Sequence, residues 1–177
     1  MKSDISLPYD TIRLLICRHA KSSRQDADID DFDRPLNRRG ERDAPEMGRR
    51  LAMQGIRPDL IMTSPAARAL TTALHYAGRL GISPEHVRRN PAQYAASVPE
   101  LIGLIRAVDP SVTTLMLVGH NPESTGLANE LGGLSIDNIP TGGIVALAFP
   151  GCSWSDLEAG GGVLLFFDYP KNLIYPR

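Results

Sequence analysis

Apolar positions along the chain form short continuous runs, which alternate with longer segments where apolar and polar residues repeat at helical spacing. Runs at residues 11–17, 60–62 and 113–119 are bounded by turn-forming residues, a pattern typical of buried strands. Two further runs, 143–149 and 162–169, are separated by a glycine-rich segment and predict an antiparallel pair. This order predicts the α/β class, as a three-layer α/β/α sandwich on a mostly parallel sheet.

Polar residues at fixed offsets predict where two of the helices begin. Asp43 and Glu46 are spaced as a capping box around Pro45, near the start of the helix that precedes the second strand. Ser97 and Glu100 form a second box, which opens a helix whose apolar positions face inward. In both boxes the side chains would satisfy backbone N–H groups of the first turn.

Proline and glycine predict the limits of the other two helices. After the second strand, Ser64 is expected as the N-cap, Pro65 as the first helical residue and Gly81 as the stop. Residues 122–131 predict a fourth helix, which ends at a pair of glycines.

Length and composition predict one globular domain over residues 1–177, with residues 1–10 as an N-terminal arm. A net charge of -1 gives no general reason to expect nucleic acid or an anionic membrane as a partner. The apolar runs are far shorter than the ~20 residues of a spanning helix, and the N-terminus lacks the apolar core of a signal peptide. We therefore expect a cytoplasmic protein. Its two cysteines, Cys17 and Cys152, show no metal-ligand spacing.

Arginine and histidine residues follow three of the predicted parallel strands. The first ends in Arg18 and His19, the second leads into a helix that bears Arg68 on its first turn, and the third ends in GHNP with His120. In open α/β sheets the ligand lies beyond the carboxyl ends of the strands, so these four side chains should converge. Because guanidinium groups bind phosphate oxygens in pairs and helix N-termini favour anions, the sequence predicts a phosphate pocket.

The motifs RHA, SPAARALTTA and VGHNP, in this order, resemble those of the histidine phosphatase superfamily, which has the phosphoglycerate mutase-like fold. The loop segment DRPLNRRG, the short length and the PTGG segment further resemble its SixA-type phosphohistidine phosphatase branch. The resemblance runs from about residue 12 to residue 149, and so covers most of the chain.

The resemblance implies catalytic roles that agree with the chemistry of these residues. His19 would be the nucleophile that attacks phosphorus and carries the phosphoryl group until water removes it. It must be neutral to do so, and the positive charges of Arg18 and Arg68 would lower its pKa while they stabilise the transition state. His120 would donate a hydrogen bond to a phosphate oxygen.

The resemblance also implies that Arg34, in the long loop after the first strand, closes the phosphate pocket. Ser22 in the same loop could add a hydroxyl donor. The larger superfamily places a carboxylate general acid in the region that reads RRNPAQYAASVPEL here, yet no carboxylate lies beside Gln93 or Tyr94. Glu100 is the nearest candidate acid, although its capping-box position accounts for it without catalysis.

The predicted function is hydrolysis of phosphohistidine on a protein through a phosphohistidine enzyme intermediate, with no metal and no cofactor. The alternatives are a general phosphomonoesterase that acts on small phosphate esters, and a phospho-ligand binding module without turnover. His19 argues against the binding module, because binding alone would need only the arginines. A site without a placed carboxylate predicts that phosphohistidine and aryl phosphates are preferred over alkyl phosphates.

Overall fold

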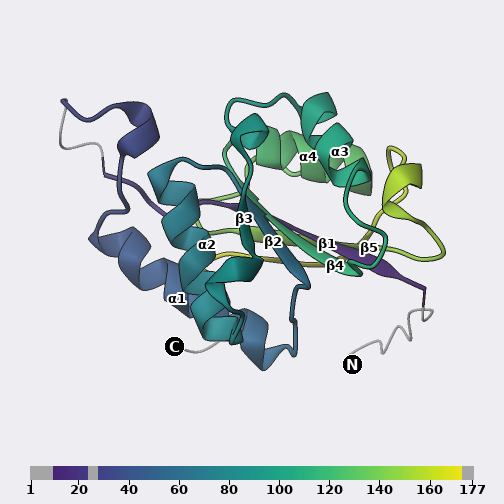
Figure 1. The fold of residues 1–177 in the computed structure, drawn as a ribbon, viewed down its shortest axis with the longest axis horizontal. Coiled ribbons are helices and arrows are strands. Elements are labelled where there is room, and N and C mark those ends of the chain that lie inside the picture. The colour runs from purple at the N-terminus through teal and green to yellow at the C-terminus, as the bar shows by residue number, and fades with distance from the viewer. Residues whose placement is uncertain (1–9, 24–27, 173–177) are drawn as a thin grey trace.

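The computed structural model describes residues 10–23 and 28–172 (Figure 1). The predicted N-terminal arm therefore lies outside the described residues, except for Asp10. Six strands form one sheet in the order β3-β2-β4-β1-β5-β6. Their bounds are β1 Ile12–Arg18, β2 Leu60–Thr63, β3 Val87–Arg89, β4 Thr114–Gly119, β5 Ile144–Phe149 and β6 Val163–Asp168.

The neighbours from β3 to β1 pair in parallel, whereas β5 pairs antiparallel with both β1 and β6. The predicted mostly parallel sheet with a final antiparallel pair is confirmed. Strand β3 was not predicted, because it is three residues long and two of these are arginines.

Helices cover both faces of this sheet (Figure 1). Helices α1 and α2 pack on one face, and α3 and α4 lie on the other, so the predicted three-layer α/β/α architecture is confirmed. Their bounds are α1 Arg38–Met53, α2 Ala67–Leu80, α3 Val98–Arg106 and α4 Glu123–Gly132. Short 3₁₀ turns lie in the connecting segments: η1 Asp31–Asp33, η2 Pro84–His86, η3 Pro91–Gln93 and η4 Trp154–Asp156.

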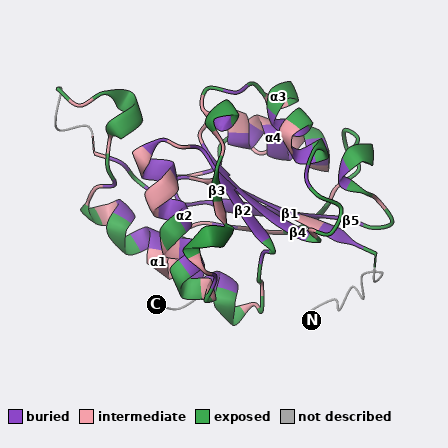
Figure 2. Cartoon of the chain, in the orientation of Figure 1, coloured by how far each residue is buried: buried purple, intermediate pink, exposed green. Residues whose placement is uncertain are grey.

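Each face of the sheet carries its own hydrophobic core, because successive side chains of a strand point to opposite faces. In β1, Leu14 and Ile16 pack in the core under α3 and α4, whereas Leu15 and Cys17 pack in the core under α1 and α2. The central strands are therefore buried on both sides (Figure 2). Because both faces of these strands are packed, the carboxyl ends of the strands form a fixed base for the site.

Two of the predicted helix starts are wrong. Helix α1 begins at Arg38, because the Asn37 side chain caps it by accepting hydrogen bonds from the backbone of Arg39 and Gly40 at 3.0 Å each. The Asp43 and Glu46 box is therefore inside the helix, and Pro45 lies there too.

Helix α2 likewise begins at Ala67 with Ala66 at the N-cap, and not at Ser64 and Pro65. Its end at Gly81 is confirmed, since Gly81 has a left-handed φ of 64° that favours glycine. The capping box of Ser97 and Glu100 is also confirmed.

Among the described residues, no helix combines the length and the apolar character that crossing a membrane requires.

Candidate active site

Backbone hydrogen bonds on both sides fix the end of β1, where the site begins. The amide of His19 donates to the carbonyl of Gly119 at 2.9 Å, which joins the ends of β1 and β4. On the other side, the PTGG segment supplies the Gly143 carbonyl to the amide of Arg18 at 3.0 Å. The amide of Gly142 donates to the carbonyls of Arg18 and His19, and its φ of 76° is one that glycine adopts without strain. This segment thus holds the backbone beneath the candidate nucleophile.

The His19 side chain is buried and is held in one tautomer. Its Nδ1 lies 2.7 Å from the carbonyl oxygen of Ala20. Because a carbonyl only accepts, Nδ1 must carry the proton, which leaves the lone pair of the neutral ring on Nε2. Burial lowers the pKa of His19 to about 3, and the charges of His120, Arg68 and Arg18 add to this effect, while the bond to Ala20 opposes it. The ring is therefore neutral at pH 7.

His120 follows β4 and faces His19, with the two ring centroids 5.2 Å apart. Its Nε2 lies 2.8 Å from the hydroxyl oxygen of Ser64, whereas its Nδ1 is buried without a hydrogen-bond partner among the described residues. Burial lowers the pKa of His120 to about 4, and the nearby charge of Arg68 lowers it further. The predicted convergence of the two histidines is found.

Arg68 and Arg34 meet on a single carboxylate, that of Asp31 in η1. Arg68 is buried on the first turn of α2 and donates to the Asp31 backbone carbonyl and, at 2.8 Å, to its Oδ2. Arg34 pairs with the Oδ1 of Asp31 at 2.8 Å. Although partial burial acts in the opposite direction, Arg68 and Arg34 hold the pKa of Asp31 below its usual value. An ionised carboxylate thus bridges two arginines that were assigned to phosphate.

Arg18 approaches the same region from the end of β1. Its Nη1 donates to the Ile139 carbonyl at 2.7 Å and to the Asn138 side chain at 3.1 Å. The Nε atoms of Arg18, Arg34 and Arg68 are buried, and none has a hydrogen-bond partner among the described residues. Buried donors without acceptors are unfavourable in the free protein, so the cluster suits an oxygen-rich anion.

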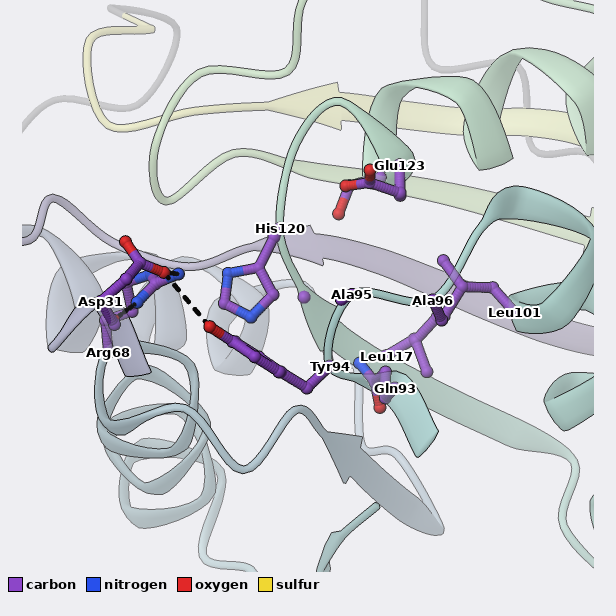
Figure 3. A pocket seen from close by; sticks show the side chains of 12 residues that line it. Asp31, Arg68, Gln93, Tyr94, Ala95, Ala96, Leu101, Leu117, His120 and Glu123 are labelled. Carbon is purple, nitrogen blue, oxygen red and sulfur yellow. Dashed lines mark hydrogen bonds and ion pairs between the residues drawn. The ribbon is translucent and has the colours of Figure 1, made fainter. Parts of the chain in front are cut away.

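A cavity of about 180 Å³ adjoins His120 and Arg68 (Figure 3). Asp31, Tyr94 and Glu123 contribute polar groups to its lining. The Tyr94 hydroxyl lies 3.4 Å from Asp31 Oδ2, and its ring packs edge-on against that of His120. Ala95, Ala96, Leu101 and Leu117 supply an apolar wall.

The cavity corrects the expectation that no carboxylate is placed at the site, since both Asp31 and Glu123 line it. Sequence reasoning missed these two residues and Tyr94. Glu123 could have been found from its position directly after the GHNP motif, and Asp31 from its place in the long loop after the first strand.

Comparisons with known proteins agree with this geometry. A family model described as histidine phosphatase superfamily, branch 1, matches residues 14–89, which include both His19 and Arg68. An uncharacterized protein of Mycobacterium tuberculosis is 35% identical over 164 residues, which span 87% of this chain and 99% of that protein. The chain belongs to the histidine phosphatase superfamily.

The fold of this histidine phosphatase is similar to the solved structures of SixA proteins. A protein assigned as the phosphohistidine phosphatase SixA of Nakamurella multipartitia is 26% identical with a TM-score of 0.77, covering 91% of this chain and 97% of that one. Its counterpart from Agrobacterium tumefaciens is 28% identical with a TM-score of 0.75, covering 90% and 98%. The predicted resemblance and the phosphoglycerate mutase-like fold are confirmed, and they support phosphatase chemistry at this site.

Of the residues predicted for the site of this histidine phosphatase, only Arg68 and His120 line the cavity. His19 lies next to it, with its ring 5.2 Å from that of His120, and the residues that do not line it are His19, Arg18, Arg34, Ser22 and Glu100. Ser22 forms a backbone bridge with Leu36, and it is not part of the cavity lining. The Glu100 carboxylate accepts bonds from the backbone amide and the hydroxyl of Ser97 at 2.7 Å each, and it does not line the cavity either. Among the described residues, no group of three or more His, Cys, Asp or Glu side chains is arranged to hold a metal ion.

Proposed function

We propose that this histidine phosphatase hydrolyses phosphohistidine on a protein, with His19 as the nucleophile and without a metal or cofactor. The observation that carries the proposal is the state of His19, a neutral ring with its lone pair on Nε2, close to the charges of Arg68 and Arg18 and to the ring of His120. Similarity to the SixA proteins supports phosphohistidine as the substrate class.

Attack by His19 Nε2 on phosphorus forms a new N–P bond as the bond to the leaving group breaks, and its electron pair departs with that group. Arg18, Arg68 and Arg34 donate to the phosphoryl oxygens, where negative charge develops. His120 donates a hydrogen bond to another of these oxygens from its buried Nδ1. Water then attacks the phosphorus, the N–P bond breaks and its electron pair returns to Nε2, which releases inorganic phosphate and restores neutral His19.

The carboxylate of Asp31 must leave Arg68 and Arg34 before these arginines can donate hydrogen bonds to a phosphoryl group. Its side chain is 57% exposed, so its ion pairs with Arg68 and Arg34 are partly screened by solvent. A phosphoryl group carries more charge than one carboxylate and offers three acceptor oxygens to the same donors. We therefore infer that substrate displaces the Asp31 carboxylate from these arginines.

A general phosphomonoesterase acting on small metabolites is the second candidate. The observation in its favour is that Asp31 and Glu123 both line the cavity, because a carboxyl group there could protonate an alkoxide leaving group. Asp31 is a poor acid, since the arginines keep it ionised.

The partner we propose is a phosphohistidine-containing phosphotransfer protein of a cytoplasmic signalling system, with no role for nucleic acid or membrane. The net charge of -1 gives no general reason to expect nucleic acid or an anionic membrane instead.

Trapping the covalent intermediate tests the proposed function. A phosphotransfer protein labelled with radioactive phosphate on histidine is mixed with the enzyme, and the reaction is quenched in alkali before one turnover is complete. We expect the label on His19 and none on the His19→Ala variant, whose turnover should fall by several orders of magnitude. Addition of a chelator should leave the rate unchanged.

Arg79→Ala, at the exposed end of α2, is the matched control and should retain full activity. Activity of His19→Ala within about tenfold of the parent would exclude His19 as the nucleophile, because loss of a covalent catalyst costs far more. Hydrolysis of alkyl phosphates but not of the labelled protein would favour the metabolite phosphatase.

A further inference from the structure

The cavity has two chemically different parts. One part carries the cations and donors that the mechanism assigns to phosphate, including Arg68 and His120. The other part has an apolar wall, to which Leu101 and Leu117 contribute, and one acidic side chain, Glu123. In Figure 3, Glu123 lies on one side of the cavity with Tyr94 on the other. The mechanism above uses only the cationic part.

Glu123 is the carboxylate of the cavity that no cation holds. It is the first residue of α4, three positions after His120, and it is only partly exposed. No hydrogen bond or ion pair joins its carboxylate to any of the residues that the structure describes, whereas Arg68 and Arg34 both hold that of Asp31. The N-terminus of α4 favours the negative charge of Glu123.

The apolar wall is set by an unusual backbone conformation. Ala95 has a φ of 58°, the only positive φ of a non-glycine residue in the part of the chain that the structure describes. An L-residue in the left-handed region raises the energy of the native state, and such residues cluster at ligand sites. Here it shapes a wall of the cavity itself.

These features match the leaving group of phosphohistidine. We propose that the part of the cavity formed by Tyr94, Ala95, Leu101, Leu117 and Glu123 binds the imidazole ring of the substrate, and that Glu123 accepts a hydrogen bond from the ring nitrogen that carries no phosphorus. This inference rests on the proposed function. A flat, largely apolar ring suits the wall, and the protonated ring has a single N–H, which needs one acceptor.

The hydrogen bond between the substrate ring and Glu123 would promote cleavage of the P–N bond. When Nε2 of His19 bonds to phosphorus, the electron pair of the broken P–N bond remains on the substrate nitrogen. The step requires the substrate ring in its protonated form, with a proton on the nitrogen that carries no phosphorus, so that the ring leaves as neutral imidazole. Glu123 stabilises the protonated ring through a charge-assisted hydrogen bond, and so makes it a better leaving group. The leaving group of a phosphate ester has no ring N–H, so it gains nothing from the Glu123 carboxylate.

Comparison of two substrates in Glu123→Gln tests the subsite. We expect kcat/KM for a phosphohistidine peptide to fall by about tenfold or more, as for loss of a charged hydrogen-bond partner. The value for p-nitrophenyl phosphate should change by less than about threefold, because its leaving group needs no such partner. Affinity for tungstate, which has no leaving group, should also be unchanged. Glu130→Gln, exposed on the same helix, is the matched control and should change none of the three.

The outcomes separate this inference from the proposed function. If the parent enzyme hydrolyses both substrates and Glu123→Gln slows them equally, or slows neither, the leaving-group subsite is wrong and the proposed function stands. If the parent enzyme hydrolyses p-nitrophenyl phosphate but no phosphohistidine peptide, the proposed function itself is wrong.

Discussion

At the scale of single residues, the site depends on two imidazoles that the fold keeps uncharged. His19 and His120 are both largely shielded from water and lie close to the guanidinium groups of Arg18 and Arg68. In the unfolded chain neither constraint exists, so each ring returns to a pKa of about 6.5. The state that prepares His19 for nucleophilic attack therefore couples folding to pH.

We predict that the free energy of unfolding falls as the pH is lowered from 7.5 to 5. The native pKa values of about 3 for His19 and about 4 for His120 lie below the unfolded values, so only the unfolded chain takes up these protons in this range. The stability contributed by the neutral rings is complete above pH ~6.5 and is lost below it, by about 2 kcal/mol per histidine at pH 5. Urea unfolding at both pH values measures the difference.

His19→Asn provides the comparison, because it removes one of the two buried imidazoles. Its loss of stability between pH 7.5 and 5 should be smaller than that of the parent by about 2 kcal/mol. Equal losses in the variant and the parent would show that His19 is protonated in the native state.

At the scale of elements, the short turn η1 holds a carboxylate against two of the proposed phosphate donors, Arg68 and Arg34. It lies in the loop between β1 and α1 and places Asp31 against Arg68 of α2 and Tyr94, which follows η3. Helix α1 closes tightly on the start of the same loop, since a Cβ on Gly40 would lie 2.2 Å from the Lys21 carbonyl oxygen. The start of the loop is thus packed against α1, and Asp31, further along the loop, pairs with Arg68 and Arg34.

We predict that Asp31→Asn binds tungstate severalfold more tightly than the parent, because a neutral amide competes less for the guanidinium groups of Arg68 and Arg34. Arg68→Ala should bind it more weakly, by about tenfold or more, because a charged donor is lost. Titration calorimetry gives both affinities. Asp33→Asn, exposed in the same turn, should match the parent. Weaker binding by Asp31→Asn would instead mean that Asp31 positions Arg68 for the anion.

Elements whose signals are local could be predicted, whereas others required the fold. The box of Ser97 and Glu100 was predicted correctly because both partners lie within one turn. The same spacing failed at Asp43 and Glu46, because Asn37 starts the helix earlier in a segment that reads as a loop. A capping pattern shows that a helix could start at a position, and it does not exclude an earlier start.

Some residues of the site could likewise be predicted from the sequence, whereas others could not. Arg18, His19 and His120 could be placed together because parallel pairing of β1 with β4 brings their carboxyl ends to one edge. Asp31 and Tyr94 are 63 positions apart, and their contact depends on how two loops fold against each other. No periodicity or spacing in the sequence indicates this contact, so the part that Asp31 plays at the site was missed.

At the scale of the whole molecule, a buried arginine joins the first helix to the last strand. Arg50 of α1 is 1% exposed and pairs at 3.2 Å with Asp168, which is 3% exposed at the end of β6. It also donates to the carbonyls of Tyr169 and Pro170. Pro170 lies against Gly142, whose amide holds the backbone of His19, so this joint continues into the site.

We predict that Arg50→Met lowers the free energy of unfolding by about 3–5 kcal/mol, because it leaves the buried Asp168 carboxylate without its cation. Arg49→Met is the matched control, since Arg49 is the adjacent residue, shares the partner Glu46 and is 39% exposed. That variant should lose far less stability than Arg50→Met, because exposed ion pairs contribute little. Adding Asp168→Asn to Arg50→Met should recover part of the loss, because the uncompensated charge is then gone. Urea unfolding at pH 7.5 ranks the variants, and equal losses for Arg50→Met and Arg49→Met would show that the pairing of Arg50 with Asp168 does not hold α1 to β6.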